Sequence, residues 1–133
     1  MTRRLSLVRR LHVLLLVWSR FVRVVVVVRR NPLPTAVTVL GTTEPGRRRA
    51  YDAHTMGSMI WRRLRIGPWR PRCLFRALVL YRLMREQGEH VQLVIGLPDA
   101  AESHEAHAWV IRDGVDLGPW PGGANHAELV RYG

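Results

Sequence analysis

The segment that most constrains this chain is residues 72–85, RCLFRALVLYRLMR, because it places the only cysteine at the start of the most strongly helical stretch. Pro71 suits the first turn of a helix, and Gly88 suits the left-handed turn that ends one. Cys73 is therefore expected on the first turn, where unpaired backbone N–H groups and the helix dipole lower the pKa of a thiol from about 8.5. The apolar side chains at helical spacing are Leu74, Ala77, Leu78, Tyr81 and Met84, and the arginines on the other side are Arg76, Arg82 and Arg85.

Charge is distributed unevenly along the chain, and all of the basic residues are arginines. Residues 1–85 contain 19 arginines and two acids, a net charge of +17, whereas residues 86–133 have a net charge of −6. Guanidinium groups bind carboxylates and phosphates bidentately, so we expect an anionic partner: an acidic peptide, a nucleic acid, a membrane surface or another protein.

The length and the cysteine count limit the class of protein. A length of 133 residues suits one domain. A single cysteine excludes an internal disulfide and fits a reducing cytosol.

The N-terminal segment is apolar and rich in arginine. Residues 4–29 are predicted to form one or two helices, and the valine run at residues 24–28 leaves the second half open between helix and strand. Because arginines interrupt the apolar run, we expect neither an export signal nor a spanning helix, but a basic amphipathic helix on a protein or membrane surface. The predicted helical stripe consists of Leu5, Val8, Leu11, His12, Leu15, Leu16 and Ser19.

The rest of the chain is predicted to alternate between breaks and short elements. Pro32 and Pro34 end whatever precedes them, residues 41–50 are rich in turn formers and suit a linker, and residues 52–65 suit a helix. Strands are predicted at residues 91–96, 107–112 and 115–120, the last two joined by a hairpin turn at Asp113-Gly114.

Helices followed by a small antiparallel sheet indicate an α+β fold. Residues 1–50 would form a basic, apolar helical region with its linker, and residues 51–133 would form the core. We expect the two regions to form one compact unit.

Cys73 and His107 are the strongest candidate catalytic pair. A thiol that opens a helix and an imidazole that opens a strand can meet when helix and sheet pack together. The imidazole would take the thiol proton, and the thiolate would attack a carbonyl carbon. In the alternative interpretation, Cys73 is a small core residue and His107 is a core histidine with a hydrogen-bond partner.

Two other kinds of site have weaker support in the sequence. Cys73, His104 and His107 could ligate zinc, but only three ligands are present and two lie in or beside a loop, so we expect no metal. A nucleic-acid surface is opposed by the absence of lysine, of a known reading motif and of an aromatic stacking platform. The arginines that could form such a surface are Arg62, Arg63, Arg65, Arg76, Arg82 and Arg85.

Several short motifs occur in order at compatible spacings: CLFRAL from Cys73, then Gly88, LVIG at residues 93–96, AHAWV at residues 106–110 and the Asp-Gly turn. This pattern resembles the transglutaminase-like cysteine peptidases of lasso-peptide maturation, over roughly residues 70–117. The resemblance implies a papain-like or transglutaminase-like fold whose nucleophile opens the central helix.

The resemblance also implies a function. Members of this family are cytoplasmic leader peptidases that cut a ribosomally made precursor between leader and core, usually with a separate protein that binds the leader. The freed core passes to an ATP-dependent macrocyclase, and the peptidase needs no cofactor. By position, Cys73 would be the nucleophile and His107 the general base and then the acid, with the Cys73 backbone N–H as one oxyanion donor and the second donor unidentified.

The third catalytic residue departs from the family pattern. The family orients its histidine with an acid about twelve residues further on, and this position is Pro119 here. A two-residue turn at Asp113-Gly114 would pair Ile111 with Asp116 and His107 with Trp120. Four residues then separate Asp116 from the position opposite His107, roughly 13 Å, which is too far for a hydrogen bond.

Other residues could take that role. Asn125 could orient His107 as an asparagine does in papain-like enzymes, and Asp113 and Glu105 are less suitable. A Cys-His dyad also stays open. The alternative to a peptidase is a catalytically silent basic adaptor that docks to an acidic protein, a nucleic acid or a membrane surface, and peripheral membrane contact is compatible with either function.

Overall fold

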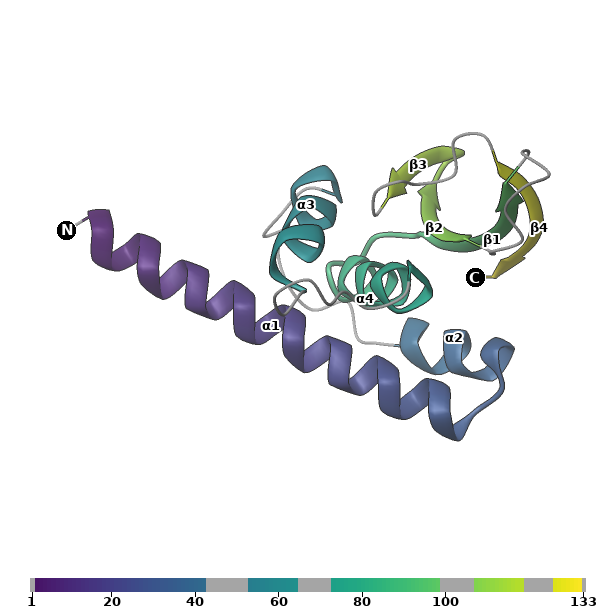
Figure 1. Cartoon of the computed structure of the whole chain (residues 1–133), viewed down its shortest axis with the longest axis horizontal. Helices are drawn as coiled ribbons and strands as arrows, with labels where there is room; N and C mark the ends of the chain where they lie inside the picture. The colour runs from purple at the N-terminus through teal and green to yellow at the C-terminus, as the bar shows by residue number, and fades with distance from the viewer. Residues whose placement is uncertain (1, 43–52, 65–72, 99–106, 119–125, 133) are drawn as a thin grey trace.

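The computed structural model describes residues 2–42, 53–64, 73–98, 107–118 and 126–132. Within these ranges, four helices precede a four-stranded antiparallel sheet, which confirms the predicted α+β fold (Figure 1). The helices are α1 (Thr2–Arg30), α2 (Leu33–Gly41), α3 (Ala53–Arg63) and α4 (Cys73–Glu86), and the strands are β1 (Gln92–Pro98), β2 (His107–Arg112), β3 (Val115–Gly118) and β4 (His126–Tyr132).

α1 is one continuous helix that includes the valine run. Each valine costs only a few tenths of a kcal/mol relative to good helix formers, and packing on one side offsets that cost. The side chains that α1 buries are Val13, Val17 and Val24, whereas Leu11 and Leu15 of the predicted stripe are exposed. Despite its arginines, Leu7–Arg30 is long and apolar enough to cross a membrane, judged by length and composition alone.

α2 is not among the predicted helices, because Pro32 and Pro34 favour a break in the sequence. Pro32 precedes the helix and Pro34 lies in its first turn, where a missing N–H costs nothing. The helix buries Ala36, Val37 and Leu40, so packing against the rest of the domain stabilises a helix that is only nine residues long. The predicted linker at residues 41–50 is partly wrong, since Gly41 is the last residue of α2; residues 43–50 lie outside the described part of the chain.

α4 begins at Cys73 and ends before Gly88, as predicted. Gly88 has a φ of 83°, its N–H donates to the Arg85 carbonyl at 3.0 Å, and the Glu89 N–H donates to the Met84 carbonyl at 3.0 Å. This pair of bonds is a Schellman motif, in which a glycine in the left-handed region closes a helix.

α4 is the central element of the fold (Figure 1). It packs against α1, α2 and α3 on one side and against β1 and β2 on the other. The arginine side of α4 is therefore covered by helices, and the Arg76 side chain is only 9% exposed. The amphipathic pattern identified the helix but did not show that both of its sides are buried.

The sheet has the strand order β3-β2-β1-β4. Asp113 and Gly114 both have positive φ, 51° and 79°, which is the type I′ turn expected for a two-residue hairpin. Arg112 pairs with Val115 and Ile111 pairs with Asp116, as predicted.

The predicted register fails beyond that point. An irregularity in the β2–β3 pairing places Gly118 opposite Val110, one residue further along β3 than a regular ladder would. The expected pairing of His107 with Trp120 therefore does not follow from the hairpin, and Trp120 itself lies outside the described residues. β4, which pairs with β1, was not predicted at all.

The two faces of the sheet have different environments. Leu93, Ala108 and Val110 belong to the main core together with α4 and the other helices. Val94, Trp109 and Ile111 form a second apolar cluster. Because successive side chains of a strand point to opposite faces, this second cluster marks the face directed away from α4.

Candidate active site

The candidate nucleophile, Cys73, is the first residue of α4. Its thiol lies outside the described part of the structure, but its backbone position is the one predicted. The N–H groups of this first turn have no carbonyl partners within the helix, and the positive end of the helix dipole lies here. Both features favour a thiolate and the developing oxyanion of an acyl-transfer reaction.

A buried cation lies one helical turn after Cys73. The guanidinium of Arg76 packs over the Trp61 ring of α3, 4.8 Å from the ring centroid. Positions i and i+3 of a helix share one side, so this cation lies on the same side of α4 as Cys73. It adds a positive charge to the environment of the helix N-terminus.

His107, the candidate base, is the first residue of β2 and pairs with Gly96 of β1. Its side chain is half-buried, and its Nδ1 atom is shielded from solvent. Strand alternation places the imidazole on the face of Trp109 and Ile111 and not on the face of Ala108 and Val110, which packs against α4.

Chain connectivity brings the starts of α4 and β2 to the same end of the molecule. α4 leads directly into β1, and β1 runs antiparallel to β2 with Gln92 opposite Ile111. The end of β2 therefore lies beside the end of α4, and an ion pair between Arg112 and Glu89 at 3.1 Å links the two ends.

The lengths of the two packed elements also match. The 14 residues of α4 span about 21 Å, and the six residues of β2 span about 20 Å. Because their ends coincide, Cys73 and His107 open their elements on the same side of the domain. His107 lies on the face of the sheet opposite α4. A contact between the Cys73 thiol and the His107 imidazole would therefore have to pass around the first residue of β2.

Asp116 is held away from His107. It pairs with Ile111, and its Oδ1 accepts a hydrogen bond from the Gly118 N–H at 2.7 Å. Four residues of β2 separate that position from His107, about 13 Å, so the predicted exclusion of Asp116 stands. Asp113 lies in the hairpin turn, further away still. Asn125, Glu105 and the family's acid position, Pro119, lie outside the described residues.

Sequence reasoning missed Glu128, because β4 was not recognised as a strand. Glu128 pairs with Gly96, and Gly96 also pairs with His107, so the two side chains flank a glycine in one row across the sheet. The indole of Trp109 lies over that glycine: its Cη2 is 2.6 Å from where a Gly96 Cβ would stand. Glu128 binds Arg131 instead, at 2.6 Å.

The face that carries His107 also contains a hollow. Its volume is about 420 Å³, and its walls combine apolar side chains with charged ones. The lining residues are Val94, Trp109, Ile111, Gly114, Asp116, Glu128 and Arg131. Trp109, two residues from His107, lines the hollow and covers Gly96, the strand partner of His107, so the hollow adjoins the candidate base.

The described residues hold no cluster of three or more metal-ligating side chains. The weak zinc alternative required His104, which lies outside the described ranges. It therefore stays untested by the structure.

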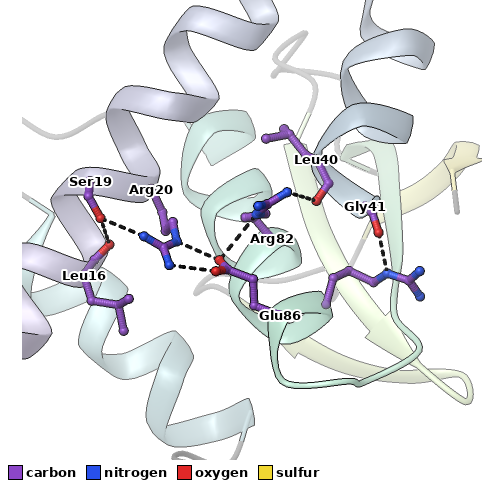
Figure 2. A network of polar contacts seen from close by, with 8 residues as sticks. Leu16, Ser19, Arg20, Leu40, Gly41, Arg82 and Glu86 are labelled. Atoms are coloured by element: carbon purple, nitrogen blue, oxygen red, sulfur yellow. Dashed lines mark hydrogen bonds and ion pairs between the residues drawn. The ribbon is translucent and has the colours of Figure 1, made fainter. Parts of the chain in front are cut away.

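The arginines considered for nucleic-acid binding are partly used inside the fold. Arg82 donates to the Leu40 carbonyl and Arg85 to the Gly41 carbonyl, each at 3.1 Å, so both stabilise the end of α2. Arg82 also contacts Glu86, which binds Arg20 of α1 (Figure 2). With Arg76 buried against Trp61, these three arginines do not form an open basic surface.

Comparison with known families supports a specific type of fold. A family model described as the transglutaminase-like superfamily matches residues 15–126, a region that includes both Cys73 and His107. Comparisons with curated proteins and with solved structures found no match.

Proposed function

Because the chain belongs to the transglutaminase-like superfamily, which includes cysteine peptidases and transglutaminases, we propose that it is a cysteine peptidase that cleaves a lasso-peptide precursor between leader and core. The observation that carries this proposal is the position of Cys73 and His107, which open packed elements at the same end of the domain. The CLFRAL and AHAWV motifs support the narrower choice of substrate.

The proposed reaction is nucleophilic acyl transfer. His107 accepts the proton of Cys73, and the thiolate attacks the scissile carbonyl to form a C–S bond. The Cys73 backbone N–H, at the helix N-terminus, stabilises the oxyanion of the tetrahedral intermediate. The C–N bond then breaks, and His107 returns the proton to the leaving amine. Water, deprotonated by His107, hydrolyses the thioester and regenerates the thiol.

In this proposal the chain works in the cytoplasm with two partners. A separate leader-binding protein presents the precursor, and an ATP-dependent macrocyclase receives the core. The hollow beside Trp109 would hold the extended segment around the cleaved bond, with Asp116, Glu128 and Arg131 available to charged groups of the peptide. No resident cofactor is required by this chemistry.

The first test follows the thiol of Cys73, which is the only one in the chain. Alkylation of the native protein would be measured by mass spectrometry from pH 4 to 9 for the wild type, His107→Ala and His90→Ala. His90 is exposed and contacts Arg85, so it is a matched control for the loss of an imidazole. We expect a rate that plateaus near neutral pH and that falls or shifts in His107→Ala only.

An inert thiol, or one that titrates near 8.5 regardless of His107, would remove the peptidase proposal and favour the basic adaptor.

A second test addresses the substrate. The chain would be co-expressed with a lasso precursor and its leader-binding protein, and the peptide masses measured. Free leader and core should appear with the wild type and be lost with Cys73→Ala, whereas an adaptor would tolerate that substitution.

A further inference from the structure

The outward side of α1 carries an unusual amount of apolar surface. Leu11 is 57% exposed and Leu15 is 62% exposed, and their apolar neighbours along the helix are similarly open. Spacings of four and seven residues align these side chains along one side of the helix. The outer stripe consists of Leu7, Val8, Leu11, Leu15, Val22 and Val26.

The packing of α1 fixes the direction of this outer stripe. At 3.6 residues per turn, its centre lies about 160° around the helix from the buried Val13, Val17 and Val24. Arg20, on the buried side, pairs with Glu86 of α4 at 2.7 Å. Trp18, at the edge of the outer stripe, is half-buried, and its Nε1 donates to the Arg63 carbonyl of α3 at 3.1 Å. The outer stripe therefore lies on the side of α1 that is directed away from the core.

The charge of α1 identifies the chemistry of a partner. Its 29 residues contain eight arginines and no acidic residue. Exposed arginines occur near both ends of the outer stripe, Arg10 at one end and Arg29 and Arg30 at the other, with Arg23 beside it. An apolar stripe bordered by exposed guanidinium groups matches acyl chains bordered by anionic headgroups.

We propose that α1 lies flat on an anionic membrane surface, with its outer stripe in the acyl boundary and its arginines at the lipid phosphates. Long arginine side chains keep their charged ends at the headgroups while their stems lie along apolar surface. This docking does not depend on catalysis, so it stands or falls separately from the proposed peptidase activity.

A flat orientation fits the contacts of α1 better than a spanning one. Crossing the bilayer would draw Arg20 and Arg23 into the hydrocarbon, which is costly for a charged side chain. It would also break the Arg20–Glu86 ion pair and strip Val17 and Val24 from the core. A helix parallel to the surface keeps all of these contacts.

The test is co-sedimentation of the full chain with phosphatidylcholine vesicles that contain or lack about one third phosphatidylglycerol. We expect binding to the anionic vesicles that weakens with salt, and little binding to the neutral ones. The double variant Leu11→Ser/Leu15→Ser should bind at least tenfold more weakly. Leu129→Ser is the matched control, because Leu129 is 60% exposed on β4, and it should bind like the wild type.

Charge is tested in the same assay. Arg23→Gln should weaken binding about fivefold. Arg62→Gln, which changes an exposed arginine of α3, should have a smaller effect.

Four outcomes would overturn the proposal. The first two are absence of binding to anionic vesicles, and unchanged binding of the Leu11/Leu15 variant, since its net charge is intact. A third is a vesicle-free dimer that becomes monomeric in that variant, which would assign the outer stripe to a second copy of the chain. The fourth is retention in vesicles after alkaline carbonate extraction, which would assign α1 to a spanning orientation.

Discussion

Glu86, at the end of α4, accepts two hydrogen bonds from Arg20 of α1, one from Nε and one from Nη2, each 2.7 Å long. Arg82 approaches the same carboxylate to 3.4 Å and also binds the Leu40 carbonyl of α2 (Figure 2). This network connects α1 and α2 to α4, the helix that begins with the candidate nucleophile Cys73. It therefore holds α1 and α2 against α4.

Replacing Glu86 with glutamine should destabilise the fold by about 1–2 kcal/mol, because charge-assisted bonds to a partly buried carboxylate are lost. Urea denaturation would measure the change. Glu128→Gln is the control: its pair with Arg131 is similarly short but well exposed, so the denaturation midpoint should not move measurably. Equal losses in the two variants would show that burial of the Glu86 network adds nothing.

The same carboxylate should make stability depend on pH. Burial raises the pKa of Glu86, but hydrogen bonds and charge from Arg20 and Arg82 outweigh burial and lower it below its ordinary value of 4.5. A group whose pKa is lowered on folding contributes stability above its unfolded value and loses that contribution as the pH falls through its folded value.

The difference in unfolding free energy between wild type and Glu86→Gln should thus be largest near neutral pH and shrink below about pH 4.5. Urea titrations at a series of pH values would check this. A difference that stays constant down to pH 3 would show that protonation of Glu86 is not coupled to folding.

The sequence predicted those elements whose signals are local. The glycine after α4 and the Asp113-Gly114 turn each specify a backbone conformation by themselves, and both have the predicted form. The helix that Pro71 predicts does begin at Cys73. Strand alternation and hairpin register also sufficed to exclude Asp116 as a partner of His107. The candidate pair of Cys73 and His107 came from their residue types at the starts of a helix and a strand, and from the order of the motifs; neither observation gives a distance.

The missed elements depend on contacts that are distant in sequence. α2 has a proline in its first turn and is stabilised by burying Leu40 against other helices. β4 is an exposed edge strand whose only described strand partner is β1. Without β4, the position of Glu128 across Gly96 from His107 could not be derived. The outward direction of the Leu11 and Leu15 stripe likewise required knowing which side of α1 packs.

Gly96 should be intolerant of any side chain. An added Cβ would stand 2.6 Å from Cη2 of Trp109 and would also collide with the Ala127 carbonyl of β4. Because a backbone oxygen cannot move aside without breaking the β1–β4 pairing, Gly96→Ala should cost about 2–3 kcal/mol.

Urea denaturation compares this variant with Gly114→Ala. A Cβ at Gly114 meets nothing within 4 Å, and only the positive φ of 79° opposes it, at a cost of about 1 kcal/mol. If Gly96→Ala were the milder change, this result would contradict the close packing of β4 and Trp109 against Gly96.

Arg76 should tune the reactivity of Cys73, since its buried guanidinium lies one turn along the same side of α4. Removing the charge in Arg76→Gln should disfavour the thiolate and slow alkylation at pH 6.5 by about threefold to tenfold. The pH profile of alkylation should shift to higher pH accordingly.

Arg76→Lys separates charge from packing, because an ammonium keeps the charge but loses the planar stack on Trp61. We expect its profile to stay close to that of the wild type, although its stability falls. If both variants shift the profile equally, Arg76 acts by holding α3 against α4 and not through its charge.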